Sequence, residues 1–346
     1  MAYKGVLEDI EKCITLNIPN QVPVFAISNE FDLNYFGITH REYERNFEKM
    51  VQNSVESVRK FNYDWILLHP DDYIEFEGII NTKENENDNI PVMPSGYIKP
   101  TFENIKKFKI PDFKKDLRMP VYLEALSQIK KIMGNNICLT GRLAAPFSSA
   151  ALIFGVQETM MLTIEGNDIL KEAIKFFTEL QIEWGREQIK AGAHAIWIGD
   201  CVASSNFISP VIYEKFAAEG LKEVTKEIKK IGGITYYHAA EKSKSHLNIM
   251  PDLGIDIVNI GEGIDIKEAK EILMGKVCIS GNLSPIKILA NRTAEDVKKE
   301  TKRIMEEGKK EGGFIFNTEE GIPYYTPVKN IQAMMDTAKE YSYYKI

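Results

Sequence analysis

The stretch Gly312–Pro327, GGFIFNTEEGIPYYTP, predicts how the rest of the chain is organised. It has the pattern of a short apolar strand that ends in a polar turn carrying two adjacent carboxylates, Glu319 and Glu320. The Thr326-Pro327 pair can provide the N-cap and first residue of a following helix. Carboxylates at the C-terminal ends of parallel strands are typical of active sites in α/β barrels, although an isolated acidic pair can equally be a solvated turn.

Seven further apolar segments end in polar residues in the same way, and helical patterns separate them. These segments are Val22–Ser28, Tyr63–His69, Asn136–Phe147, Gly192–Asp200, Gly232–His238, Ile255–Gly261 and Lys276–Asn282. Eight strands alternating with helices favour a closed parallel barrel, whereas a doubly wound sheet would usually show a Gly-rich phosphate turn after its first strand. We therefore predict an α/β fold, a (β/α)8 TIM barrel, as a single domain over residues 1–346 with an N-terminal helical extension.

Composition and charge limit the classes of partner. The chain has 346 residues, of which 44% are hydrophobic and 27% are charged, as in ordinary globular proteins. A net charge of -7 argues against a nucleic-acid or anionic-membrane partner. The apolar runs are too short to span a bilayer, and the first twenty residues lack a signal-peptide pattern. Cys13, Cys138, Cys201 and Cys278 lie far apart, which suits reduced thiols. We expect a cytoplasmic protein, and we expect Asn81–Pro91, rich in Asn and Glu, to be a mobile surface loop.

In such a barrel the polar residues at the strand ends would converge on one mouth. They are Glu30, His69, Asp71, Asp72, Arg142, Asp200, Cys201, His238, Glu241, Glu262, Asn282, Glu319 and Glu320. His with carboxylate or thiolate is a ligand set that suits zinc, although the chain has neither an HExxH motif nor paired cysteines. Each candidate has a plainer alternative. His238 can hydrogen-bond a neighbouring loop, Cys201 can be a small buried side chain, and Arg142 can be an ion-pair partner.

Several motifs carry a resemblance to a known family. They are Phe102–Pro120, Gly192–Phe216, the stretch GIDIVNIGEGIDIKEAK, ISGNLSP at Ile279–Pro285, and FNTEEGIPYYTPVKNI at Phe316–Ile331. On these motifs the chain resembles the uroporphyrinogen decarboxylase superfamily over nearly its whole length. The resemblance implies a (β/α)8 barrel whose site lies at the C-terminal mouth, and either a decarboxylase or a corrinoid-linked methyltransferase.

The resemblance also allows the two branches to be compared. The decarboxylases carry an arginine-rich N-terminal segment, but the matching stretch FAISNEFDLNYFGI has no Arg or Lys. The methylcobamide:coenzyme M methyltransferases bind zinc through a His-x-Cys pair and a distant Cys. His238 matches their His, whereas Ala240 and Glu320 occupy the two Cys positions. The resemblance thus implies a zinc site of His238 and Glu320, completed by Cys201 or Asp200, with His238, Glu320 and Asp200 as catalytic residues.

A harder His/Glu site suits activation of a methyl ether oxygen rather than of a thiol. This chemistry belongs to the methyltransferase I components of anaerobic O-demethylase systems, which the chain also resembles. The resemblance implies methyl transfer from a small donor, a methoxyaromatic, to the cobalt of a corrinoid carried by a partner protein. We expect Glu30, Arg142, Tyr237, Asn282 and Tyr325 to bind the substrate. Methyl transfer from a methylcobamide to a thiol, uroporphyrinogen decarboxylation and a binding barrel without catalysis remain as alternatives.

Overall fold

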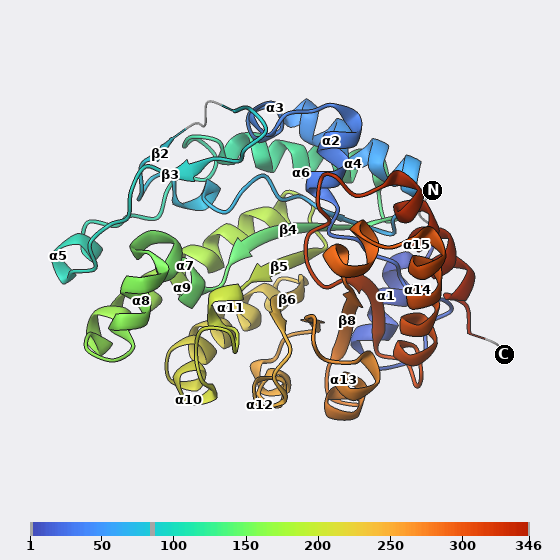
Figure 1. Cartoon of the computed structure of the whole chain (residues 1–346). Helices are drawn as coiled ribbons and strands as arrows, with labels where there is room; N and C mark the ends of the chain where they lie inside the picture. Colours follow the sequence, from blue (N-terminus) through green and yellow to red (C-terminus); the bar gives the residue numbers. More distant parts are fainter. Residues whose placement is uncertain (1–2, 84–86, 345–346) are drawn as a thin grey trace.

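The computed structural model describes residues 3–83 and 87–344, and within them seven parallel strands form one curled sheet surrounded by helices (Figure 1). The strands follow one another in chain order as β1 (Trp65–Leu67), β4 (Cys138–Ala144), β5 (Ala195–Gly199), β6 (Ile234–Glu241), β7 (Ile257–Ile260), β8 (Cys278–Leu283) and β9 (Phe314–Thr318). Each neighbouring pair is parallel, so all seven strands end at the same mouth. The expected α/β barrel is therefore confirmed.

The predicted strand Val22–Ser28 is an extended segment that lies between β9 and β1 and closes the sheet. Val24 forms a parallel bridge to Phe316, and the Phe25 amide donates to the Phe316 carbonyl at 2.9 Å. On the other side the Asp64 amide donates to the Val24 carbonyl at 3.0 Å. Regular pairing stops there because Pro23 has no N–H and the Val24 amide donates instead to Asp64 Oδ2 at 2.8 Å. The segment thus occupies the position of the eighth barrel strand without forming a regular strand.

The helices form the outer layer of the barrel (Figure 1). Their bounds are α1 (Val6–Ile14), α2 (Asn29–Phe36), α3 (His40–Arg45), α4 (Phe47–Phe61), α5 (Phe102–Ile105), α6 (Met119–Met133), α7 (Pro146–Phe154), α8 (Val156–Leu162), α9 (Asn167–Lys190), α10 (Pro210–Ile212), α11 (Ala218–Lys230), α12 (Lys244–Leu247), α13 (Ile266–Leu273), α14 (Ala294–Gly308) and α15 (Val328–Tyr341). One predicted helix, from Thr39 to Phe61, is split. Asn46 leaves helical geometry and caps α4 by accepting a hydrogen bond from the Lys49 amide at 3.1 Å.

Helix α1, the predicted N-terminal helical extension, covers the end of the barrel opposite the mouth. Its apolar face packs against the first residues of several strands in a buried cluster that we call the floor: Val6, Ile10, Cys13, Trp65, Cys138, Ala195, Tyr236, Ile257, Cys278 and Ile315. Cys13 Sγ donates to the Phe314 carbonyl at 3.3 Å. The floor therefore seals one end of the barrel with apolar side chains.

A polar layer separates the floor from the mouth. The Tyr236 hydroxyl donates to Ser280 Oγ at 3.0 Å and accepts from Asn259 Nδ2 at 2.9 Å and Asn317 Nδ2 at 2.7 Å. These residues belong to β6, β7, β8 and β9, so one phenol joins four strands. These hydrogen bonds fix the barrel interior directly below the mouth, although the buried Asn259 Oδ1 atom has no partner among the described residues.

The stretch Asn81–Pro91 begins in a small antiparallel pairing of β2 (Thr82–Lys83) with β3 (Met93–Pro94). Its residues 84–86 lie outside the described part of the chain, so its predicted mobility stays a prediction. Pro91 lies at the rim of the mouth. In the described part of the chain no helix is both long enough and apolar enough to cross a membrane.

Candidate metal centre and active-site cavity

Three side chains from three strand ends meet at the mouth of the barrel. His238 lies on β6, Cys201 begins the short turn after β5, and Glu320 follows β9 by two residues. One ligand atom from each lies within 4.8 Å of the other two, and among the described residues this is the group able to hold a metal ion. His238 Nε2 is 3.3 Å from Glu320 Oε2. Strands in parallel register bring together residues that are 37 to 119 positions apart in the chain.

The electrostatics of this cluster are set by the contact between His238 and Glu320. The His238 ring is buried, which opposes its charge, but the Glu320 carboxylate and the Cys201 thiol outweigh burial and raise the pKa of His238 to about 10. In turn, the charge of His238 lowers the pKa of Glu320, although partial desolvation of this half-exposed carboxylate opposes the shift. The ring also stacks on Trp197, with the ring centroids 4.7 Å apart. A histidine held between an indole and a carboxylate has little freedom to rotate.

The chemistry of the donors fits Zn²⁺. Imidazole nitrogen, thiolate sulfur and carboxylate oxygen are the three ligand types that zinc takes in proteins. Three protein ligands leave one position of a tetrahedral ion open for a substrate, which is the pattern of catalytic rather than structural zinc. The buried Nδ1 atom of His238 has no hydrogen-bond partner in the described structure, so the ring nitrogens are not committed elsewhere. Cys201, His238 and Glu320 are therefore the residues that would hold the ion.

These three residues line a cavity of about 310 Å³, in the size range of small-molecule sites. The cavity wall also includes Glu30, His69, Asp72 and Trp197. Among the described residues that line it none is Lys or Arg, and several are acidic. The cavity is suited to a small neutral or cationic molecule rather than to a polyanion.

The structure does not bring Asp200 and Tyr237 into this group. The Asp200 carboxylate accepts hydrogen bonds from Ser148 Oγ at 2.7 Å and from the Tyr237 hydroxyl at 3.0 Å, on the outer side of the sheet. Burial raises the pKa of Asp200 to about 6. The pleat explains the difference because adjacent residues face opposite sides, so Tyr237 points out where His238 points in. Through these hydrogen bonds Asp200 fixes the turn that carries Cys201.

Three other expected substrate-binding residues also lie off the cavity wall. Arg142 is buried and pairs with Glu75 at 2.8 Å and Asp72 at 3.1 Å. Asn282 donates to the Ile264 carbonyl at 2.9 Å. Tyr325 is exposed and packs edge-on against Tyr324. Glu30 does line the cavity, where its side chain is accessible.

The most prominent residue that the sequence interpretation missed is Trp197, which lies between the rings of His238 and His69. Its ring centroid is 5.5 Å from that of His69. A signal was available, since Trp197 alternates with Ala195 and Gly199 on the inward side of β5. An inward-facing indole near a strand end supplies a flat apolar wall to a site.

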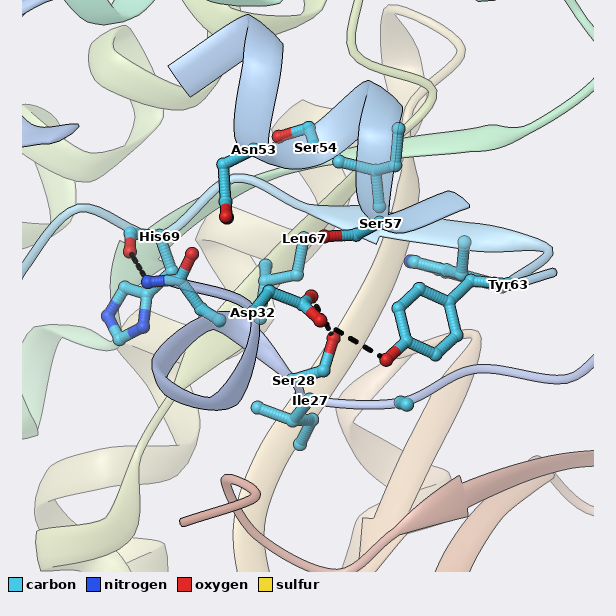
Figure 2. Close-up of a pocket in the computed structure, with 13 residues that line it drawn as sticks. Ile27, Ser28, Asp32, Asn53, Ser54, Ser57, Tyr63, Leu67 and His69 are labelled. Carbon is cyan, nitrogen blue, oxygen red and sulfur yellow. Dashed lines mark hydrogen bonds between the residues drawn. The ribbon is translucent and has the colours of Figure 1, made fainter. Parts of the chain in front are cut away.

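A second, much smaller cavity of about 30 Å³ lies behind the wall of the first and shares Ile27, Asn29 and His69 with it. Figure 2 shows Asp32 in its centre, with hydrogen bonds from the Ser28 hydroxyl at 2.6 Å and the Tyr63 hydroxyl at 3.3 Å. Asn53 and Ser57 of α4 face the same space (Figure 2). Burial raises the pKa of Asp32 to about 7. This polar pocket anchors the start of α2 and lies next to His69 of the larger cavity.

A profile of one protein family, uroporphyrinogen decarboxylase (URO-D), matches residues 18–341. The chain belongs to the uroporphyrinogen decarboxylase family. Named relatives in the family fall into two groups. The methylcobamide:CoM methyltransferase MtbA of Methanosarcina acetivorans is 29% identical over 226 residues, which cover 65% of each chain. The uroporphyrinogen decarboxylase of Carboxydothermus hydrogenoformans is 26% identical over 301 residues, covering 85% of this chain and 83% of that protein.

A solved structure described as a methyltransferase from Methanosarcina mazei superposes with a TM-score of 0.86 over 97% of this chain and 98% of that one. At 22% identity this likeness shows the family fold. The match to the first of the curated relatives spans slightly less than two thirds of that protein's length. Since decarboxylases and methyltransferases both occur among relatives of similar identity, the choice between the two reactions depends on the side chains at the mouth.

Proposed function

We propose that the chain is a corrinoid-dependent methyltransferase that removes a methyl group from a small methylated donor, a methoxyaromatic, and passes it to the cobalt of a corrinoid carried by a partner protein. The observation that carries the proposal is the cluster of Cys201, His238 and Glu320 at the wall of a cavity of about 310 Å³. A metal ligand set with one open position beside a flat indole suits an aromatic ether held by its ring and its oxygen.

In this proposal the chain binds, orients and desolvates the donor. Trp197 lines the cavity beside the cluster, where an aromatic donor would contact the exposed part of its ring, and the remaining wall would shield the donor from water. His238, Cys201 and Glu320 would hold Zn²⁺, which when bound would supply Lewis-acid polarisation of the ether oxygen. Because Co(I) is itself a strong nucleophile, the chain needs orientation and leaving-group stabilisation rather than a nucleophile of its own.

The charges of the cavity count against the decarboxylase alternative. A porphyrinogen carries many carboxylates and would need cationic partners, yet the described lining residues include Glu30, Asp71, Asp72 and Glu320 and no Lys or Arg. The cations behind the wall are already paired: Arg142 with Asp72 and Glu75, and Arg118 with Asp71 at 2.6 Å. Desolvating a polyanion against carboxylates is strongly unfavourable.

The test is a single-turnover assay that follows conversion of cob(I)alamin to methylcobalamin with methoxyphenols as donors. We expect transfer by the unmodified chain and loss of most of it in Glu320→Ala, which deletes one donor of the cluster. Glu320→Cys should not improve ether demethylation, although it can tighten zinc binding. The matched control is Glu262→Ala, because Glu262 also follows a strand end but pairs with Lys287 on the surface. Equal rates in Glu320→Ala and the unmodified chain would remove the cluster from the reaction.

A second candidate function is methyl transfer from a methylcobamide to a thiol. It is favoured by the sulfur of Cys201 within the cluster and by the names of two relatives that are 29% identical, the methylcobamide:CoM methyltransferases MtbA of Methanosarcina acetivorans and Methanosarcina mazei. Zinc with a sulfur ligand suits activation of a thiol substrate as a thiolate. In the same assay run in reverse, thiol methylation faster than ether demethylation, together with a gain in Glu320→Cys, would select this function over the first.

A further inference from the structure

A line of four charged or titratable side chains runs from the barrel wall to the cavity, and none of them belongs to the metal cluster. Glu75 Oε2 is 2.8 Å from Arg142 Nη1, and Arg142 Nη2 is 3.1 Å from Asp72 Oδ1. Asp72 Oδ1 is in turn 3.2 Å from Nε2 of His69. The line ends at the His69 ring, which lines the cavity together with the metal cluster.

The inner half of this line is rigid. Glu75 and Arg142 are buried, with 0% and 1% of their surfaces exposed, and the Glu75 carboxylate also accepts the Ala144 amide at 3.1 Å. A buried guanidinium remains charged and has a fixed planar geometry, so Arg142 holds Asp72 in one place. A buried ion pair of this kind stabilises the fold weakly, if at all, since desolvation offsets the attraction. Its position below a cavity histidine suggests a role in placing Asp72.

The outer half faces the cavity. The Asp72 side chain is 55% exposed and that of His69 is 26% exposed. The surrounding protein limits hydration of the Asp72 carboxylate, which opposes its charge, but the hydrogen bond from His69 and the charge of Arg142 hold the pKa of Asp72 below its ordinary value. Asp72 is therefore an anion that orients the His69 imidazole through their hydrogen bond.

The backbone and the ring of His69 are both held in place. Its carbonyl accepts a hydrogen bond from Asn29 Nδ2 at 3.0 Å. Its ring centroid lies 5.5 Å from that of Trp197, whose other neighbour is His238 at 4.7 Å. A donor lying against Trp197 would therefore have the metal cluster and His69 among its near neighbours.

We propose that His69 is the proton donor to the oxygen that loses the methyl group, with Asp72 as the residue that positions it. The inference rests on the proposed function. In the step, the bond between the methyl carbon and the ether oxygen breaks and its electron pair stays on the oxygen. The methyl carbon forms its new bond to the Co(I) of the partner corrinoid. The proton of the His69 imidazolium passes to the leaving oxygen, and the neutral imidazole keeps its contact with Asp72 until solvent returns a proton.

This role narrows the class of donor. A phenol of high pKa is a poor leaving group as the bare phenolate, so a proton donor lowers its barrier most. A nitrophenolate leaves readily without a proton, so a proton donor accelerates its departure little. The site is therefore built for electron-rich or unactivated aryl methyl ethers, for which general acid catalysis contributes about 10²–10⁴-fold.

The experiment compares the unmodified chain, His69→Gln and Asp72→Asn in single-turnover demethylation by cob(I)alamin. The donors are a series of aryl methyl ethers, from 4-nitroanisole to 4-methoxyphenol, whose phenol products span a wide range of pKa. For His69→Gln we expect a loss of about 100-fold or more with the poorest leaving groups and little loss with 4-nitroanisole. Asp72→Asn should steepen the dependence on phenol pKa in the same direction by a smaller amount. Zinc content per chain is measured for each variant and should not change.

The control is His194→Gln, since His194 lies before β5 at the end of the barrel away from the mouth and contacts Lys130. It should leave the dependence on phenol pKa unchanged. A uniform loss across the donor series in His69→Gln, or no loss, would overturn the role of His69 while leaving the proposed function intact. Failure of the unmodified chain to demethylate any ether of the series would overturn the proposed function and this inference with it.

Discussion

At the floor of the barrel three cysteines are enclosed among apolar side chains, whereas at the mouth the fourth, Cys201, faces a cavity. Burial raises the pKa of Cys13 to about 12 and raises those of Cys138 and Cys278 further above their ordinary value. Cys201 instead lies beside His238 and Glu320. The cysteines at the floor are thus inert packing residues and the cysteine at the mouth is a candidate ligand. This difference in reactivity comes from the surroundings of each thiol rather than from the residue type.

The largest effect should come from the mouth. His238→Ala removes the central donor of the cluster, so we expect zinc content to fall from about one ion per chain and methyl transfer to fall by more than about 100-fold. Because the ring is buried and stacked on Trp197, its removal should also lower the free energy of unfolding in urea, by about 1–3 kcal/mol. Elemental analysis of protein purified without chelators measures the first effect. Full zinc content in this variant would show that the three residues are not the ligands.

A substitution at the floor should instead affect stability more strongly and leave zinc binding unchanged. Trp65 is buried and its ring lies 5.1 Å from that of Phe25, so Trp65→Ala should lower the free energy of unfolding by about 3–5 kcal/mol. Urea titration followed by circular dichroism measures this loss, with Trp65→Phe as a milder control. Zinc content per folded chain should remain that of the unmodified protein. Loss of metal at a temperature where the variant is folded would mean that the two ends are not independent.

The pocket around Asp32 gives a smaller effect that depends on pH. Because burial raises the pKa of Asp32 to about 7, the folded chain binds a proton that the unfolded chain releases near pH 4. Its contribution to stability is present below pH 4 and is lost as the pH rises through 7. As the pH rises from 5 to 7, the free energy of unfolding of Asp32→Asn should therefore increase relative to that of the unmodified chain, by at most about 2–3 kcal/mol. Urea midpoints measured across this range provide the check, and a gain in the acid direction would contradict the assignment.

The smallest perturbation is thiol labelling, which should leave the fold intact. In the native protein we expect Cys201 to react first with a thiol reagent such as DTNB, and the three floor cysteines to react only after denaturation. Added zinc should slow the reaction of Cys201. Cys201→Ser identifies the fast thiol by removing it. Rapid labelling that persists in this variant would show that the floor opens.

Much of the barrel could be predicted from the sequence because each buried strand is a short apolar run that ends in polar residues. Two elements could not. The segment Val22–Ser28 has the composition of a strand, but Pro23 lacks a donor and a carboxylate, Asp64, takes over the pairing of Val24. The helical pattern from Thr39 to Phe61 is continuous in apolar spacing, yet the side chain of Asn46 caps a new helix within it. In both cases a single side-chain hydrogen bond outweighs the local pattern.

The site shows a similar division. The sequence and the family resemblance nominate His238, Cys201 and Glu320, which the structure brings together. They also nominate Asp200 and Tyr237, each one residue away from an inward-facing position. Where a strand passes into a turn, a shift of one residue decides which side chain faces the cavity, and apolar spacing does not fix that shift. The pairing of Arg142 with Glu75 and Asp72 depends on contacts between distant segments and has no local signal.

The segment Val22–Ser28, which closes the sheet, also has a consequence for how the chain is made. Its partner β9 lies about 290 residues later, and the Cys13 thiol donates a hydrogen bond to the Phe314 carbonyl across a separation of 301 residues. A chain that folds as it leaves the ribosome must keep this first segment unpaired until β9 has been synthesised. Glu320 follows that last strand, so all three candidate ligands come together only after the barrel has closed. Capture of a metal ion by this cluster would therefore mark nascent chains that have completed their fold.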